Sequence, residues 1–269
     1  MATRPTKQFL HQTYSQQGLS TWAIEKKFGI SRSTTYSLLK KYQIPIRSIA
    51  RAHIKYPRSD FSGDLQEKAY LLGFSIGDLR VRSHNGRQSE TISIACGSTK
   101  PAQIELIEGL FSKYGRVWKG KPDKRNVVNI EAFVNKSFTF LLPEKRTYLW
   151  CNKRKLFLSF LAGFTDAEGS FYISNGKAFV AWGNYDVIIL RFIKKQLAKY
   201  GIVTPRINSD SLQGYVGSHG YARNKNYAHL TCSRKQTVRV LLRELKPFLK
   251  HADKKNKLAS LDMNLKIRK

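Results

Sequence analysis

The sequence predicts an α+β fold: two αββαββα repeats that form a pseudo-twofold saddle, preceded by a small all-α helix-turn-helix domain. Two alignments predict the repeats, because residues 70–81 match residues 160–171, and residues 103–115 match residues 189–201 in the same order. The third observation is charge. The N-terminal segment contains a single acidic residue, Glu25, and this sets it apart from the repeats.

These patterns divide the 269-residue chain into four parts. We expect a helix-turn-helix DNA-binding domain at 1–45, a basic linker at 46–60, the first repeat at 61–149 and the second repeat at 150–269. The hydrophobic content of 41% is ordinary for a globular protein, so the chain has enough apolar material for a core.

Helix start and stop signals predict the N-terminal domain. Ser20 and Ser31 stand where N-caps are expected, and Gly29 can end the first helix in a left-handed conformation. The inner face of the second helix is expected to carry Thr35, Leu38, Leu39 and Tyr42. Its outward face resembles a recognition helix that enters a major groove. The candidate DNA contacts on that face are Arg32, Ser33, Thr34, Tyr36 and Lys40. A helical hairpin with a solvated basic face is the alternative.

The hydrophobic periodicity of the remaining chain predicts the same elements twice. The first repeat is expected to contain a helix ending at Asp78, strands near 80–84 and 90–96, a helix at 101–114, strands near 116–119 and 127–133, and a helix from about Lys136. The second repeat is expected to contain a helix ending at Glu168, strands near 170–174 and 178–182, a helix at 185–200, strands near 204–208 and 227–232, and a helix at 234–245.

Charge points to the class of partner. A total of 48 Lys and Arg against 18 Asp and Glu gives a formal net charge of +30. Nucleic acid is the favoured polyanion, because each neutralised phosphate releases a condensed counterion. A membrane surface is less favoured, since the sequence has no apolar run of about 18 residues and no signal-peptide pattern. The isolated cysteines and scattered histidines predict no zinc site and indicate an intracellular, reducing compartment.

Small residues on each repeated helix recur at a spacing of four: Gly73 with Gly77, and Gly163 with Ala167. Residues at i and i+4 share a face, so each helix should present a shallow groove to the other. The next residue in each copy is acidic, which places two carboxylates at neighbouring helix C-termini. A helix C-terminus already carries partial negative charge, so the pair predicts a bound cation.

Hard oxygen ligands favour Mg²⁺, with Mn²⁺ as a second option, and such a site can activate water for phosphodiester cleavage. The candidate metal site consists of Asp78, Glu168, Gly77 and Ala167. Taken alone, either motif would more often be a core helix with a polar end. Duplication in register on so basic a chain favours the functional interpretation.

Residues 161–169 are similar to the nine-residue LAGLIDADG signature, and residues 71–79 resemble a degenerate first copy. The resemblance is to the LAGLIDADG homing endonucleases in their monomeric, two-motif form, over about residues 61–265. It implies a site-specific double-strand DNA endonuclease that hydrolyses phosphodiesters with divalent metal at a long, pseudo-symmetric site. One departure is Leu79, which stands where the family usually has glycine.

The same resemblance assigns roles to individual residues. Asp78 and Glu168 occupy the eighth position, the metal-binding acid of the family, and Asp166 is expected to cap or to bond locally. A lysine at the start of the last helix of each repeat should lie near the reactive water, which indicates Lys136 and Lys235, with Arg234 as an alternative. Solvated cations at helix N-termini are the competing interpretation. Residues 246–257 resemble the closing helix of the family, with its basic residues on DNA phosphates.

Strand alternation turns Ile92, Ile94, Phe171 and Ile173 toward the helices, and Thr91 and Ser93 outward. Two sheets side by side would form a concave surface for DNA, where Arg reads guanine and Asn or Gln reads adenine. The candidate contacts in the repeats are Arg80, Arg82, Arg87, Gln88, Arg116, Ser170, Tyr172, Ser174, Arg206, Asn208 and Lys225.

Two other functions fit the same fold. A DNA-binding regulator could have lost cleavage and use the helix-turn-helix as its main reader, and a splicing maturase would bind the RNA of its intron. Acids at both eighth positions favour the nuclease. We therefore expect a monomer that binds double-stranded DNA and no membrane, with RNA as a less favoured partner.

Overall fold

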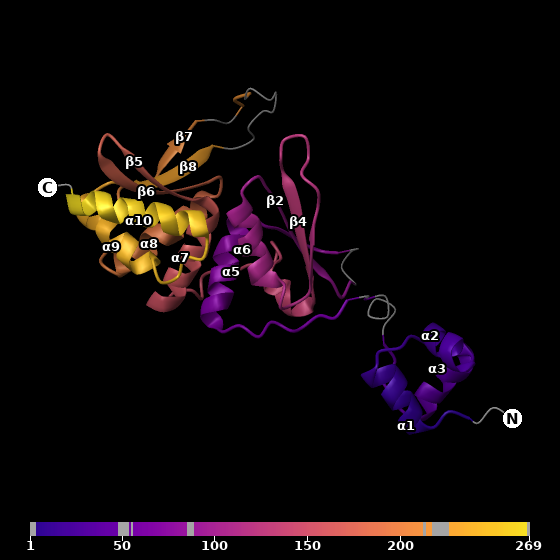
Figure 1. The fold of residues 1–269 in the computed structure, drawn as a ribbon. Coiled ribbons are helices and arrows are strands. Elements are labelled where there is room, and N and C mark those ends of the chain that lie inside the picture. The colour runs from indigo at the N-terminus through magenta and orange to yellow at the C-terminus, as the bar shows by residue number, and fades with distance from the viewer. Residues whose placement is uncertain are drawn as a thin grey trace. The chain divides into compact units, whose positions relative to one another are not determined.

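The computed structural model describes residues 4–47, 54, 56–84, 89–211, 214–216 and 226–267, and the chain forms two compact units (Figure 1). The first unit is Met1–Tyr56 and the second is Pro57–Lys269, so the boundary falls within the predicted linker. The candidate residues Arg87, Gln88 and Lys225 lie outside the described residues.

The first unit is helical. It contains α1 (Lys7–Leu10), the π-helical turn η1 (His11–Gln16), α2 (Thr21–Phe28) and α3 (Arg32–Lys41) around a core of Leu10, Ile24, Leu38 and Leu39. The Ser20 hydroxyl accepts a hydrogen bond from the Ala23 amide at 3.0 Å, and Ser31 accepts one from Thr34 at 3.1 Å. Gly29 has φ 69°. The expected caps of both helices are therefore confirmed.

The second unit contains the two repeats. The first has α5 (Leu65–Gly77), β1 (Arg80–Ser83), β2 (Ile92–Ser98), α6 (Pro101–Phe111), β3 (Arg116–Lys119), β4 (Val128–Val134) and η2 (Lys136–Leu141). The second has α7 (Arg154–Glu168), β5 (Gly169–Ser174), β6 (Lys177–Asn184), α8 (Val187–Lys199), β7 (Asn208–Asp210), β8 (Tyr227–Cys232), α9 (Lys235–Leu245) and α10 (Ala252–Ile267). The predicted duplication is confirmed.

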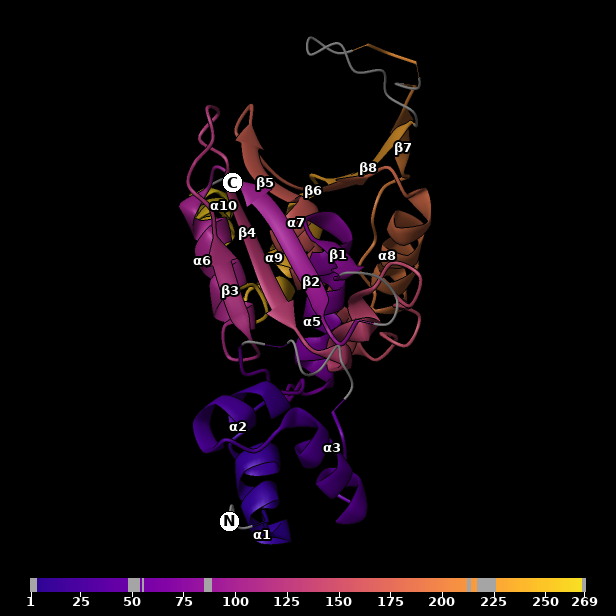
Figure 2. The same ribbon diagram turned by 90° about the vertical axis from the view of Figure 1, so that its right-hand side faces the viewer.

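Each repeat forms a four-stranded antiparallel sheet, in the orders β1-β2-β4-β3 and β5-β6-β8-β7. Helices cover one face of each sheet: α6 packs on β2, β3 and β4, while α8 and α9 pack on β6 (Figure 2). Helices α5 and α7 lie side by side between the two sheets (Figure 1). We call the opposite face of each sheet its open face.

Two expected elements differ from the structure because of proline. The closing helix of the first repeat is a single 3-10 segment that ends before Leu142, whose ψ is 137°. Pro143 follows, and a residue before proline avoids the helical region. The strand expected near 204–208 is replaced by the short β7 at Asn208–Asp210, because Pro205 has no N–H for a sheet ladder.

Three side chains differ in exposure from what strand alternation predicted. Ile173 is 46% exposed, because it stands one residue pair from the tip of the β5–β6 hairpin, whose turn holds Asn175 and Gly176 at positive φ. Thr91 and Ser93 are buried although they point away from the helices. Neighbouring side chains cover them, since Arg58 donates to the Thr91 hydroxyl at 2.6 Å and Ser93 donates to Glu131.

The crossing of α5 and α7 is a contact between backbones. A Cβ atom on Gly73 would lie 2.0 Å from the Phe160 carbonyl oxygen, and one on Gly163 would lie 2.0 Å from the Tyr70 carbonyl oxygen. Real Cβ atoms do not approach oxygen so closely, so glycine is required on both helices. The prediction that the small-residue grooves face each other is confirmed.

Replacing Gly163 with alanine should lower the free energy of unfolding by about 3 kcal/mol, because the helices must separate to admit the methyl group. Gly109 in α6 is the matched control, since a Cβ there would meet nothing within 4 Å. Gly109→Ala should instead stabilise the protein by about 0.5–1 kcal/mol, because alanine favours a helix interior. Urea denaturation measures both, and equal effects would rule out the close crossing.

Candidate active site

The helix crossing brings together the acids of the two repeats. Asp78 caps the C-terminus of α5, and Glu168 is the last residue of α7. A Cβ atom on Gly77 would lie 2.6 Å from both the Ala167 Cβ and the Glu168 Cγ, so the end of α5 touches the side chain of Glu168. Four of the predicted site residues therefore converge, although the acids are far apart in sequence.

Burial disfavours the ionisation of both carboxylates. Burial raises the pKa of Asp78, and the Gln103 hydrogen bond and the charges of Lys254 and Lys100 offset this in part. Burial also raises the pKa of Glu168, and the negative charge of Asp78 raises it further, while Lys254 lowers it. A cation bound beside the two half-buried carboxylates would therefore stabilise their charged forms.

Neutral amides hold the acids in place. Gln103 of α6 donates to Asp78 Oδ2 at 2.7 Å, and Asn184 at the end of β6 donates to Glu168 Oε1 at 3.5 Å. An amide orients a carboxylate without cancelling its charge, so the acids keep their capacity to bind a metal. The equivalent of Gln103 in the second repeat is Ile189, and the two acids therefore have different surroundings.

The sequence predicted phosphate contacts for the basic residues of 246–257, and the structure places one of them, Lys254 of α10, beside the acid pair. Its ammonium donates to the carbonyl of Gly169, the residue after Glu168. Burial and the charge of Lys100 lower the pKa of Lys254, while Asp166 raises it. It stands in a run of similar lysines, so nothing in the local sequence distinguishes it.

The two lysines expected near the reactive water are not among the residues that shift the pKa of Asp78 or Glu168. Lys136 pairs with Glu90 at 2.8 Å, beyond the end of β4 where Val134 faces Ile92. The acid-bearing end of β1 instead faces Ala95, about 10 Å further along β2. Lys235 is the first residue of α9. The lysines that lower the pKa of the acid pair are Lys254 and Lys100, so a catalytic role for Lys136 and Lys235 remains a prediction.

Asp166 bonds across the fold and not locally as expected. Its Oδ2 accepts hydrogen bonds from the Tyr70 hydroxyl at 2.6 Å, the Lys250 amide at 2.7 Å and the His251 amide at 3.1 Å. Burial raises the pKa of Asp166, and these three bonds lower it. Asp166 therefore fastens α5 and the chain entering α10 to α7, and its role is structural.

The backbone leaves the two motif helices, α5 and α7, in different ways. Gly169 follows Glu168 in extended conformation, and a Cβ there would lie 2.6 Å from the Thr165 carbonyl oxygen. In the first repeat α5 ends one motif position earlier, with Asp78 as its cap, and Leu79 is buried in the core. The first repeat accommodates its departure from the glycine pattern in this way.

The residues present fit a hard divalent cation. Two half-buried carboxylates meet where the last carbonyls of two helices have no partner within their helix, and oxygen ligands of this kind suit Mg²⁺ or Mn²⁺. Among the described residues, no group of three or more His, Cys, Asp and Glu could hold a metal ion. A metal here would therefore need carbonyls, water or a bound phosphate besides the two acids.

The open faces of the sheets are polar and basic. The predicted DNA contacts that the structure describes in the repeats are all exposed: Arg80, Arg82, Arg116, Ser170, Tyr172, Ser174, Arg206 and Asn208. Two rings stack on this surface, since Tyr172 lies 4.9 Å from Phe179 with an interplanar angle of 3°. Exposure is required for base contact, and which residues contact DNA remains a prediction.

In the first unit, one face of α3 is exposed over the predicted contacts Arg32, Ser33, Thr34, Tyr36 and Lys40. The Lys40 ammonium lies 4.8 Å from the centre of the Tyr36 ring, and Arg32 pairs with Glu25 at 2.9 Å. The structure thus presents a polar, basic helix face, and its use on DNA is still a prediction.

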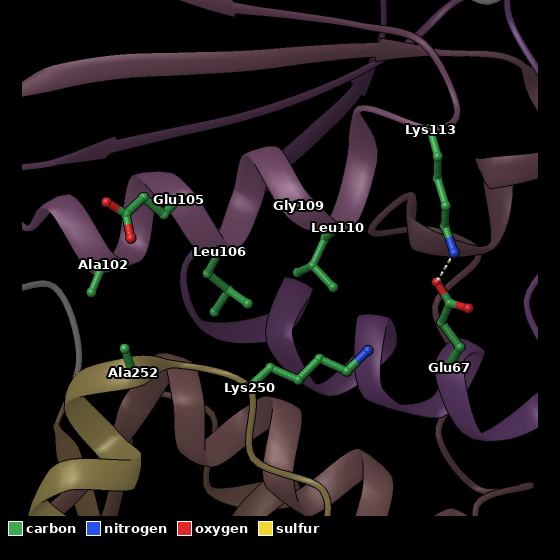
Figure 3. Close-up of a pocket in the computed structure, with 9 residues that line it drawn as sticks. All are labelled: Glu67, Ala102, Glu105, Leu106, Gly109, Leu110, Lys113, Lys250 and Ala252. Atoms are coloured by element: carbon green, nitrogen blue, oxygen red, sulfur yellow. Dashed lines mark ion pairs between the residues drawn. The ribbon is translucent and has the colours of Figure 1, made fainter.

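A cavity of about 420 Å³ lies between α6, α5 and the start of α10 (Figure 3). Its charges are mixed, and Lys113 pairs with Glu67 at 3.0 Å across it. Neither motif acid lines this cavity. No described helix is long and apolar enough to cross a bilayer.

Comparison with known proteins supports the motif assignment. Residues 156–246, from α7 through α9, match the family model of the LAGLIDADG-like domain. The solved structure of I-DmoI in complex with DNA and Ca is 17% identical, covers 74% of this chain and 98% of that chain, and has a TM-score of 0.50. I-AabMI bound to uncleaved DNA is 12% identical, with coverages of 74% and 90% and a TM-score of 0.48. No curated protein matches the chain.

Neutralising either acid should stabilise the metal-free protein at neutral pH. A carboxyl whose pKa is raised by folding stabilises the fold below its ordinary pKa, and this contribution is lost as pH rises through the raised value. Asp78→Asn and Glu168→Gln should therefore unfold at higher urea than wild type at pH 7.5 in EDTA. The difference should shrink toward pH 4 and reverse when Mg²⁺ is added. Glu105→Gln, on the exposed side of α6, controls for lost charge, and an unchanged midpoint in the acid variants would contradict the strained pair.

Replacing Lys254 with methionine should lower the free energy of unfolding by about 1.5–3 kcal/mol, because a charged hydrogen bond is lost and the acids lose their nearest compensation. Lys255→Met on the same helix is the control. Its side chain is exposed, so its effect should stay within about 0.5 kcal/mol. Similar denaturation curves for the two variants would show that Lys254 has no special role.

Proposed function

We propose that this chain, whose second repeat is a LAGLIDADG-like domain, is a site-specific double-strand DNA endonuclease that hydrolyses phosphodiesters with divalent metal at a long, pseudo-symmetric site. One observation carries the proposal: Asp78 and Glu168, from separate repeats, meet at the end of the helix crossing. Two paired carboxylates can hold a metal ion for phosphodiester hydrolysis. Without a bound cation, burying two negative charges side by side destabilises the fold.

Asp78 and Glu168 would hold the metal, beside the helix ends at Gly77 and Ala167. Bound Mg²⁺ or Mn²⁺ would supply Lewis-acid activation of water and stabilise the oxygens of the reacting phosphate. Gln103 and Asn184 keep the carboxylates oriented through their amide hydrogen bonds. Lys254 adds a fixed positive charge, which would help to attract the phosphate to the acid pair.

Double-stranded DNA is the substrate that the charge and the surface favour. The chain carries a net charge of +30, and exposed arginines stand on the strands of the first repeat and, as Arg206, just before β7 of the second. Arginine binds phosphates and guanine edges, so the same surface can supply affinity and sequence selection. The similar structure of I-DmoI, whose partners are DNA and Ca, supports this substrate class.

The N-terminal unit would add a second contact with the same DNA. The exposed face of α3 has the composition of a recognition helix, with Arg32, Tyr36 and Lys40 on its surface. A unit joined by a short basic linker would extend the recognised site beyond the part covered by the two repeats. A selected site confined to the part that the repeats cover would argue against this role.

Incubating the protein with Mg²⁺ and a randomised duplex library, then sequencing the cut ends, tests the proposal. Wild type should yield one family of sites, and EDTA should abolish cutting. Asp78→Asn and Glu168→Gln should each reduce the cleavage rate at least about 100-fold, or about 2.7 kcal/mol in the barrier, while both still bind the site. Glu105→Gln should cut normally. Intact DNA that is bound in a salt-sensitive way would instead identify a non-cleaving DNA-binding protein.

A further inference from the structure

A hollow of about 520 Å³ lies directly beside Asp78 in the first repeat, lined in part by the open face of its sheet. Ala95 and Gly97 of β2 line part of it. The strand register places Arg80 opposite Ala95 on one side and Glu131 opposite Ala95 on the other. The backbones of Arg80 and Glu131 are therefore about 10 Å apart, and both long side chains can reach over Ala95.

Glu131 is unexpected on this surface. A carboxylate that faces DNA is repelled by phosphates, and the fold does not need one here, because the equivalent position of the second repeat is Thr231. Ser93 donates a hydrogen bond to Glu131 Oε1, and Arg82 lies 3.5 Å from the same oxygen. These contacts hold the side chain in place and leave Oε2 with acceptor capacity.

The major groove explains a carboxylate beside an arginine. Guanine presents two acceptors, O6 and N7, and its partner cytosine presents an amino donor at N4. Arg80 supplies N–H donors and Glu131 supplies an acceptor, on opposite sides of the small Ala95. Together they match the acceptors of guanine and the amino donor of cytosine. The same arrangement fits an A·T pair less well, because thymine offers an acceptor and a methyl group where cytosine offers its donor.

We infer that Arg80 and Glu131 read one G·C base pair next to the cut in the first half-site, Arg80 donating to guanine and Glu131 accepting from the cytosine amino group. This inference rests on the proposed function for the placement of DNA on the open sheet faces. It assigns sequence selection to the part of the hollow nearest the acid pair, where Arg80 and Glu131 stand on either side of Ala95.

The second repeat provides an internal comparison. Ser170, Ala181 and Thr231 form the row equivalent to Arg80, Ala95 and Glu131. A Cβ at Gly183, the equivalent of Gly97, would lie 2.1 Å from the Tyr227 hydroxyl, whereas a Cβ at Gly97 would lie 3.2 Å from Asn129 Oδ1 and from Val127 Cγ1. The charged pair is not repeated there. The G·C preference should therefore occur in one half of the pseudo-symmetric site.

Selection of bound duplexes from the randomised library tests the inference without relying on cleavage. Glu168→Gln is the parent protein, so that bound DNA stays intact. The parent should enrich one G·C pair at the inner edge of one half-site at least about tenfold over other pairs. Adding Glu131→Gln should reduce that preference about tenfold and admit A·T pairs, because glutamine also reads adenine. Adding Glu105→Gln should leave it unchanged.

A transfer experiment provides a second, independent measurement. Ser170→Arg together with Thr231→Glu should install a G·C preference at the mirrored position of the other half-site. An unchanged preference after Glu131→Gln, or a parent site without such a pair, would overturn the inference. Because the readout is bound DNA, a protein that selects the pair but never cuts would refute the endonuclease proposal alone.

Discussion

The contact between the backbones of Gly73 and Gly163 is the constraint on which the rest of the structure depends. With no side chain between them, α5 and α7 approach until a Cβ would lie 2.0 Å from a carbonyl oxygen of the other helix. This close approach brings the C-terminal ends of α5 and α7 together, with one four-stranded sheet on each side of the helix pair. A wider crossing would separate the acids and change the angle between the two open sheet faces.

The acid pair imposes a cost that the surrounding residues partly offset. Desolvation disfavours the charge of both carboxylates, and the charge of Asp78 further disfavours that of Glu168. The structure keeps them by placing Lys254 nearby and by fastening α5 and the chain entering α10 to Asp166 of α7. Such strain is common where function needs a group that folding does not, since stability and activity place different demands on the same residues.

Duplication gives the scaffold symmetry, whereas the surfaces have become different. Gln103 holds Asp78, but Ile189 stands at the equivalent position beside Glu168. The charged row of the first sheet becomes the neutral Ser170 and Thr231 in the second. A scaffold of this kind suits a DNA sequence whose halves are similar in geometry and different in bases, because backbone contacts follow the symmetry and base contacts follow the side chains.

The sequence by itself determined the repeated element order, the helix caps, the facing glycines and the two acids, because each depends on local periodicity or on the spacing of a few residues. Tertiary structure decided which lysine lies beside the acids, which partners Asp166 binds, and that Glu131 stands in the hollow next to Asp78. These depend on register and on contacts between residues up to 96 positions apart. Short-range pattern carries no information about such contacts, since any of the many lysines of this chain would read alike until the fold places one of them beside the carboxylates.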